Sequence, residues 1–450
     1  MLISQVLNMD FLLAAAEDTR SNLDDSLVER RRRTSIDQGP LTHISTHDIR
    51  DVVDELARAH RASAATASVK ASEMWMPRDP ILAILQTELT RALHAQTGSL
   101  ITDTEGLASL RIAADPGTRD AERRRAFGKF EVTRPKIFSD PRWVWAGVVI
   151  AWHRFKNKAP FGGLPQQAVR IADDARVVLL GDWGSGLPRA QAVAKRIRDV
   201  LDEGVADKRE QHVVHLGDVY YTGAKEEYTD NFLAYWPVRP GEPIGSYTIC
   251  GNHDMYRGGH DFYATALTDP RFDRQADRSV FALKNSNWQF LGLDTAYEDH
   301  QLSNGQVEWV HEQLSAAANL NTVLLSHHQG WSAYEDAGAQ LRAQLADVLA
   351  TERVDAWFWG HEHRCLTYDA QHGVGFASCL GHGGVPEYLI AQDPLPYPVG
   401  LRYDYRLKHG TGLEPWNTFG FAVIELNARD MVVRYIDERG VEHHREHLQR

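Results

Sequence analysis

The 450-residue sequence contains only three cysteines, Cys250, Cys365 and Cys379. Secreted scaffolds that depend on a disulfide framework use cysteine far more densely, so that class of protein is excluded, although the count leaves room for one disulfide. Two of the three cysteines lie in apolar segments that resemble strands. We therefore expect reduced, buried thiols in a reducing compartment, and we predict a cytoplasmic protein.

Long hydrophobic runs are also absent. The densest, residues 143–152, is too short to span a bilayer and is bounded by Arg142 and Arg154. Residues 1–16 are mildly apolar, but no basic residue precedes the apolar part and Asp10 interrupts it, which argues against a secretory signal. The sequence thus predicts no membrane span and no export.

Positive charge is scarce as well. Lysine and arginine number 49 against 61 aspartates and glutamates, for a net charge of −12. This balance argues against a general binder of nucleic acid or of anionic membranes, although a metal cluster can still create a local positive site. The basic run at residues 30–33 has acidic neighbours, and we interpret it as a solvated helix end.

What the sequence does contain is a series of short apolar segments that each lead into Asp, Asn or His. The five motifs are Gly181-Asp182-Trp183-Gly184, Gly217-Asp218-Val219-Tyr220-Tyr221, Gly251-Asn252-His253-Asp254, Ser326-His327-His328 and Gly360-His361-Glu362-His363. A single motif of this kind is usually only the corner between a strand and a loop. Five in order, each behind an apolar run, favour a ligand site at the carboxyl ends of strands in an α/β fold.

These residue types are metal ligands. A carboxylate can bridge two cations, and amide oxygens and imidazoles suit divalent or trivalent first-row metals. Two metals roughly 3.5–4 Å apart can hold both the attacking and the leaving oxygen of a displacement at phosphorus. A metal site centred on Asp218 is therefore the leading hypothesis.

The series resembles the calcineurin-like metallophosphoesterases, whose ordered blocks are Asp-x-His, Gly-Asp, Gly-Asn-His-Asp/Glu, His and Gly-His-x-His. The resemblance covers roughly residues 170–440. Gly184 stands where the family has a histidine, which removes one ligand. Tyr221 follows Asp218 by three residues, as in the Gly-Asp-x-x-Tyr of the purple (tartrate-resistant) acid phosphatase branch, and we interpret it as the replacement ligand. The alternative is an aromatic side chain that packs beneath the site.

The resemblance implies two metal ions bridged by Asp218. It assigns Asp182, Tyr221 and His363 to the first ion, and Asn252, His327 and His361 to the second. A phenol has an ordinary pKa near ~10, so it binds as phenolate only to a strongly acidic ion. The resemblance therefore implies Fe(III) in the first site and Fe(II), Zn or Mn in the second.

Three further residues are predicted to act on the substrate. His253 would stabilise the phosphate or protonate the leaving oxygen, with Asp254 orienting its ring; the alternative is that His253 only positions Asn252. The acid phosphatase branch has a further histidine after the fourth block, and here His328, a carboxyl at residues 335–336, or His253 alone could supply that acid. We expect His382 in a surface turn, and we expect no ligands among His443, His444 and His447.

The predicted reaction is hydrolysis of a small-molecule phosphate ester, a monoester in preference, by a metal-bound hydroxide and without a covalent intermediate. Two alternatives stay open. One is a phosphodiesterase that acts on cyclic nucleotides or nucleic acid. The other is a non-catalytic regulatory or interaction protein in which the N-terminal region carries the function beside a vestigial site.

The chain is predicted to divide into a mainly helical N-terminal region, residues 1–165, and a metallophosphoesterase domain, residues 166–450. Helices are expected at 46–61, from Pro80 onward, and at 143–155, 189–201, 307–318 and 340–350. A hairpin is expected at 279–293, and closing strands at 374–379, 419–426 and 431–436. This order predicts an α/β fold of two sheets packed face to face with helices outside, the four-layer αββα sandwich that the resemblance also implies.

Overall fold

The computed structural model describes residues 158–334, 338–385, 400–407 and 417–448. The predicted helices before residue 157 and the basic run at 30–33 lie outside the described residues, and the domain boundary at residue 165 stays a prediction. Within the described ranges, no helix combines the length and the apolar character needed to cross a bilayer.

The six-stranded sheet has the order β14-β13-β12-β2-β3-β4. Its parallel half consists of β2 (Arg176–Leu180), β3 (Gln211–His215) and β4 (Gly245–Thr248). Its antiparallel half consists of β12 (Gly420–Asn427), β13 (Asp430–Asp437) and β14 (Glu442–Leu448). The motifs with Asp182, Asp218 and Asn252 follow the parallel strands.

The eight-stranded sheet has the order β1-β5-β6-β7-β8-β10-β9-β11. Parallel neighbours in its centre are β6 (Trp288–Gly292), β7 (Asn321–Ser326), β8 (Val354–Trp359) and β10 (Ala377–Leu380). This centre is flanked by β5 (Phe281–Lys284) and β9 (Cys365–Tyr368), and the edge strands are β1 (Val169–Arg170) and β11 (Leu401–Asp404). The four histidines of the last two motifs follow β7 and β8.

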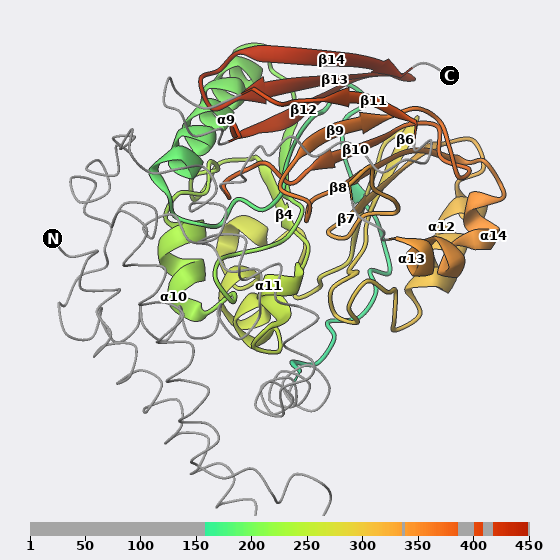
Figure 1. The fold of residues 1–450 in the computed structure, drawn as a ribbon, viewed down its shortest axis with the longest axis horizontal. Helices are drawn as coiled ribbons and strands as arrows, with labels where there is room; N and C mark the ends of the chain where they lie inside the picture. Colours follow the sequence, from blue (N-terminus) through green and yellow to red (C-terminus); the bar gives the residue numbers. More distant parts are fainter. Residues whose placement is uncertain (1–157, 335–337, 386–399, 408–416, 449–450) are drawn as a thin grey trace, which may run out of the picture. The chain divides into compact units, whose positions relative to one another are not determined.

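The two sheets pack face to face with helices on both outer faces (Figure 1). An apolar cluster from both sheets fills the space between them, including Val177, Val214, Phe290 and Phe358. Helix α9 (Pro188–Ala206) covers the six-stranded sheet, and α12 (Gln306–Ala316), α13 (Ala339–Gln344) and α14 (Ala346–Leu349) cover the eight-stranded sheet. The predicted α/β four-layer sandwich is therefore confirmed.

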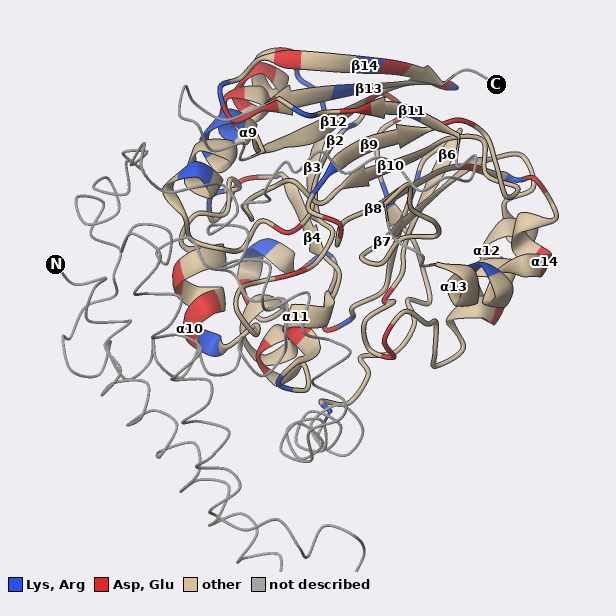
Figure 2. Ribbon diagram, viewed as in Figure 1, with Lys and Arg blue, Asp and Glu red and all other residues tan. Residues whose placement is uncertain are grey.

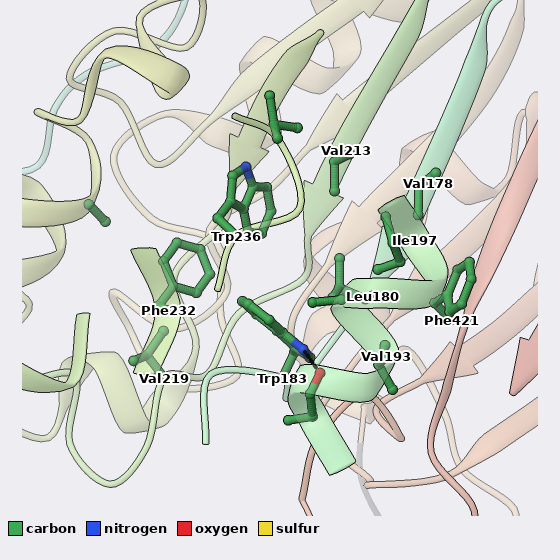
Figure 3. Close-up of a cluster of buried hydrophobic side chains, with 14 of the residues drawn as sticks. Val178, Leu180, Trp183, Val193, Ile197, Val213, Val219, Phe232, Trp236 and Phe421 are labelled. Atoms are coloured by element: carbon green, nitrogen blue, oxygen red, sulfur yellow. Dashed lines mark hydrogen bonds between the residues drawn. The ribbon is translucent and has the colours of Figure 1, made fainter. Parts of the chain in front are cut away.

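Aromatic packing fixes the first motif beside α9 (Figure 3). Trp183 follows Asp182 directly, and its ring contacts Phe232 and Trp236 with centroid distances of 5.7 and 5.9 Å. Its indole nitrogen donates a hydrogen bond of 2.7 Å to the Ala190 carbonyl in α9. Because Trp183 is only 1 % exposed, this packing restrains the backbone that carries Asp182.

The helix expected at 340–350 is divided into α13 and α14 at Leu345, which has φ −93° and ψ 11°. A strand at the C-terminus, β14, was not expected. Acidic and basic residues lie side by side along it (Figure 2), and charged side chains are typical of edge strands that must not pair with other chains. The last strand was expected at 431–436, so His443, His444 and His447 lie on a strand that the sequence did not predict.

A buried histidine beside the site gives the fold a pH dependence. Burial lowers the pKa of His215, the last residue of β3, to about 3. In the unfolded chain the pKa of His215 is about 6.5. Below that pH, His215 is therefore protonated in the unfolded state but stays neutral in the folded state. We expect this histidine to contribute stability at neutral pH that is lost as the pH falls, by roughly 2 kcal/mol at about pH 5.

Urea unfolding at about pH 7.5 and pH 5 tests this expectation. His215→Gln can keep the hydrogen bond to Thr248 Oγ1, 3.2 Å from His215 Nδ1, but has no charge to gain. We expect the loss of unfolding free energy between the two pH values to shrink by roughly 2 kcal/mol in the variant. An identical loss in both proteins would contradict the assignment.

Candidate metal centre

Asp218 lies where the five motifs meet. Its Oδ2 atom is 3.1 Å from Tyr220 Oη on one side and 3.4 Å from His327 Nε2 on the other. Its Oδ1 atom accepts a hydrogen bond of 2.9 Å from the His253 amide. The Asp218 residue is 1 % exposed. Its buried Oδ2 atom is therefore the point at which two groups of polar atoms meet.

The first group contains Asp182, Tyr220 and His363. Tyr220 Oη lies 2.9 Å from Asp182 Oδ1 and 2.9 Å from His363 Nε2. The His363 ring is 3.3 Å from the same Asp182 oxygen. Asp182 Oδ2 accepts a hydrogen bond of 2.7 Å from the His361 amide, which ties the first motif to the last.

The second group contains Asn252, His327 and His361. Asn252 Oδ1 is 2.8 Å from His327 Nε2 and 2.9 Å from His361 Nδ1, and the two imidazole nitrogens are 3.2 Å apart. Asn252 Nδ2 donates to Tyr256 Oη at 2.8 Å, and His327 Nδ1 lies 2.9 Å from the Leu216 carbonyl. These outer contacts turn Asn252 Oδ1 and His327 Nε2 toward the cluster. Hydrogen-bond partners commonly orient metal ligands in this way.

Both groups have the composition and spacing of metal sites. A metal ion with bonds of about 2.1 Å separates neighbouring ligand atoms by about 3.0 Å in an octahedron and about 3.4 Å in a tetrahedron. The contacts around Tyr220 Oη span 2.9–3.1 Å, and those around His327 Nε2 span 2.8–3.4 Å. Carboxylate, phenol, amide and imidazole together suit first-row transition metals. The residues therefore fit two cations that share Asp218.

The sequence model of the calcineurin-like phosphoesterase family matches residues 175–365. These residues match a calcineurin-like phosphoesterase domain. Human tartrate-resistant acid phosphatase type 5 is 26 % identical over 310 residues, which cover 62 % of this chain and 91 % of that protein. A probable cyclic nucleotide phosphodiesterase of Rhodococcus erythropolis is 26 % identical over 211 residues, covering 45 % of this chain and 67 % of that protein. A solved structure, the purple acid phosphatase of yellow lupin seeds, matches at 17 % identity and a TM-score of 0.45, over 64 % of this chain and 55 % of that one.

The tyrosine that the phosphoesterase domain brings into the cluster is Tyr220, not Tyr221. Gly184 forms a parallel bridge with Val219, and the Tyr220 amide donates to the Gly184 carbonyl at 2.9 Å. The Val219 side chain lies against Gly184, whereas the Tyr220 phenol lies in the cluster, 2.9 Å from Asp182 Oδ1. The Gly-Asp-x-x-Tyr spacing therefore selected the wrong member of the tyrosine pair.

Gly184 is the residue that permits this approach. A Cβ atom at position 184 would lie 2.8 Å from Val219 Cγ2 and 3.0 Å from Val219 Cα. A histidine there, as in the general family pattern, would push the second motif away from the first. The glycine at position 184, where the family has a histidine, thus allows the close approach that places the Tyr220 phenol in the cluster.

The backbone of the site is held in an uncommon conformation. The backbone angle φ is 56° at Asp182, 73° at Asp218, 69° at His361 and 52° at His363. Residues other than glycine rarely adopt this left-handed region, and such strain concentrates at functional sites, where the surrounding structure enforces it. Four of the metal-ligand candidates share this feature.

Carboxylates and imidazoles in the cluster shift the pKa values of one another. Burial alone would raise the pKa of Asp218, but the imidazoles of His327 and His253 hold it well below its usual range. Burial lowers the pKa of His327, yet the carboxylates of Asp218 and Asp182 raise it to about 9. A proton on His327 thus offsets the carboxylates, and cations that bind here would replace it.

His253 lies beside Asp218, but its orienting partner differs from the expected one. His253 Nδ1 is 2.7 Å from the Tyr221 carbonyl, and its Nε2 is 3.9 Å from Asp218 Oδ2. Asp254 instead accepts hydrogen bonds from the amides of Asp218, Val219 and Gly251, at 3.0, 3.2 and 2.7 Å. Asp254 therefore braces the two loops, and the prediction that it orients the His253 ring was wrong.

His328 is buried behind the second group. Its Nδ1 lies 3.0 Å from both oxygens of Thr295, and its ring centroid is 4.7 Å from that of His361. Sequence reasoning missed His300, whose ring lies 3.8 Å from His328 and 5.4 Å from His361. No motif marked His300, because it sits alone in the loop after β6. The alternative carboxyls at residues 335–336 lie outside the described part of the chain.

Proposed function

We propose that the phosphoesterase domain hydrolyses phosphate monoesters of small molecules at a centre of two metal ions. The observation that carries the proposal is the position of Asp218 Oδ2, 3.1 Å from the first ligand group and 3.4 Å from the second. A shared carboxylate oxygen is what a two-metal phosphoesterase requires. The similarity to tartrate-resistant acid phosphatase supports a monoester substrate.

In this proposal Asp182, Tyr220 and His363 hold the first ion, and Asn252, His327 and His361 hold the second, with Asp218 common to both. The Tyr220 phenol favours Fe(III) in the first site, because only a strongly acidic ion displaces a phenolic proton at neutral pH; Fe(II), Zn or Mn would occupy the second. When bound, the two ions supply a water of lowered pKa as the nucleophile and offset the charge on the phosphoryl group.

The chain's own contribution to the leaving group is assigned to His253. His253 Nδ1–H donates a hydrogen bond to the Tyr221 carbonyl, which fixes the ring and leaves Nε2 facing the side of the Asp218 carboxylate. A proton on Nε2 can pass to the departing oxygen of the ester. His328 is a second candidate for this step by its position, since its ring centroid lies 4.7 Å from that of His361. Burial and the neighbouring imidazoles lower the pKa of His328, which disfavours the protonated form and makes His253 the preferred acid.

Substitution of His253 should reveal this role through its dependence on the leaving group. We expect His253→Gln to lower kcat by about 10²-fold for an alkyl phosphate, since general acid catalysis typically contributes 10²–10⁴-fold. The decrease should be much smaller for p-nitrophenyl phosphate, whose leaving group needs little protonation. His260→Gln, an exposed histidine seven residues further along the chain, serves as the control. Equal losses for both esters would remove the acid role from His253.

The reaction itself is tested with two synthetic esters. The metal-loaded full chain should hydrolyse p-nitrophenyl phosphate faster than bis(p-nitrophenyl) phosphate. The reverse order would favour a phosphodiesterase, the activity named for the Rhodococcus relative. No hydrolysis of either ester with iron, zinc or manganese would support the non-catalytic alternative.

We propose a cytoplasmic location because the cysteines are free thiols. Cys250, Cys365 and Cys379 are all buried and unpaired with one another. Buried free thiols are typical of proteins in reducing compartments. Separation of cell fractions followed by detection of the chain would test this location, and recovery from the medium would contradict it.

A further inference from the structure

A second group of metal-ligand atoms lies apart from the phosphoesterase centre. Cys365 is the first residue of β9, His382 follows β10, and His443 lies on β14. One ligand atom from each, the sulfur and two imidazole nitrogens, lie within 4.8 Å of one another. We name these three residues the sulfur–imidazole cluster. It joins the eight-stranded sheet, through β9 and β10, to the edge of the six-stranded sheet.

In the described part of the chain, imidazole nitrogens of this cluster are buried without a well-formed hydrogen bond. His382 is 1 % exposed, and neither of its ring nitrogens makes a hydrogen bond of ordinary geometry within the described residues. His443 Nε2 is likewise buried and unpartnered among those residues. Leaving a buried polar group without a partner is unfavourable, and a native protein usually has a reason for it, such as a bound ion.

The surroundings of His443 are those of a metal ligand. Its Nδ1 lies 3.0 Å from Tyr403 Oη, and Tyr405 stacks on its ring at a centroid distance of 3.6 Å. A metal-binding histidine commonly uses one ring nitrogen for the ion while a fixed polar partner holds the other. Nε2 is thereby left free for the cluster.

His382 is held in place by the backbone around it. Its carbonyl accepts a hydrogen bond of 3.0 Å from the Gly420 amide. A Cβ atom at position 420 would lie 2.7 Å from His382 Nε2, so glycine is the residue that leaves room for the ring. His382 is therefore a packed interior residue, and its expected place in a surface turn was wrong.

We propose that Cys365, His382 and His443 bind one thiophilic transition-metal ion, zinc or copper, in a structural site that joins the two sheets. Thiolate and imidazole together select these ions and disfavour magnesium, calcium and manganese. On binding, the sulfur–metal bond replaces the S–H bond and the thiol proton passes to solvent. The site shares no ligand with the phosphoesterase centre, so its occupancy is independent of catalysis.

Metal analysis of the full chain tests this site against matched variants. After dialysis with zinc and then with copper(I), the wild type should retain one equivalent more than Cys365→Ser and His443→Gln. Cys379→Ser is the control, because Cys379 packs with the outer cluster of the same sheet whereas Cys365 faces the core between the sheets. The ion that is retained as the extra equivalent identifies the site as zinc or copper. Equal metal content in all four proteins would overturn the proposal.

Cobalt(II) supplies a second readout that does not depend on a folded cysteine variant. In the cobalt-loaded wild type, a thiolate ligand produces a sulfur-to-cobalt charge-transfer band in the near ultraviolet, which the phosphoesterase centre, lacking cysteine, cannot produce. We expect the band in wild type and Cys379→Ser, and its loss in His443→Gln, whose side chain is partly exposed and tolerates exchange. A wild-type spectrum without this band would contradict the site, whatever the chain's phosphatase activity.

Discussion

Asp218→Asn should lower kcat/KM for p-nitrophenyl phosphate by at least about 10³-fold, or ~4 kcal/mol of transition-state stabilisation, and should release at least one of the two catalytic ions. The amide carries no charge and offers one oxygen, whereas the Asp218 carboxylate faces both ligand groups and also holds the His253 amide at 2.9 Å. Activity assays and metal analysis on the same preparation measure both effects.

Asp294→Asn is the matched control for this substitution. Asp294 is also a fully buried carboxyl that follows a strand, β6, but it accepts hydrogen bonds from the amides of Ala296 and Tyr297, at 3.0 and 2.8 Å. An asparagine oxygen can accept the same two bonds. We expect Asp294→Asn to keep both ions and most of the activity, and a loss as large as that of Asp218→Asn would point to damage of the fold.

The second large effect separates two adjacent tyrosines. Tyr220→Phe should abolish the visible phenolate–iron band and lower activity by about 10²-fold, the loss that follows removal of a metal ligand or its close partner. Tyr220 Oη lies within 3.1 Å of atoms from Asp182, Asp218 and His363. Tyr221→Phe should keep the band, because the contact of Tyr221 to the site, through His253, is made by its carbonyl.

Each tyrosine variant serves as the control for the other, because both remove one hydroxyl group from the same turn. A band that survives in Tyr220→Phe and disappears in Tyr221→Phe would reverse the assignment. A colourless enzyme with zinc or manganese in both sites would remove Fe(III) from the proposal and leave the ligand groups intact.

The order and type of the ligands could be predicted from the sequence because each lies directly after an apolar strand. Parallel strands such as β2 and β3, or β7 and β8, bring their carboxyl ends to one edge. The distances between Asp182, Asp218, Asn252, His327, His361 and His363 follow from that topology. A pattern of residues on strand ends is thus enough to predict that these side chains meet at one edge.

The errors arose where a contact between distant segments decides the outcome. Whether Tyr220 or Tyr221 faces the cluster depends on the bridge between Gly184 and Val219, 35 residues apart in sequence. His253 is oriented by a backbone carbonyl, which carries no sequence signal. Spacing rules transferred from a family cannot tell which of two adjacent side chains a contact between distant segments turns toward the site.

The C-terminal strand β14 shows the same limit for a different reason. Its sequence, Glu-His-His-Arg-Glu-His-Leu, lacks the apolar alternation by which strands are recognised, because most of its side chains are at least partly exposed at a sheet edge. Pairing with β13 alone defines it. The position of His443 in the sulfur–imidazole cluster therefore depends on tertiary structure, and no local sequence pattern predicts it.

The most direct test of the central claim is anomalous X-ray diffraction from crystals of the full chain, recorded at the absorption edges of iron, zinc and manganese. We expect two peaks on either side of the Asp218 carboxylate, roughly 3.5–4 Å apart, one within bonding distance of Tyr220 Oη and the other of His327 Nε2. Crystals of a catalytically active preparation with no peak, or a single peak, beside Asp218 would contradict a two-metal centre.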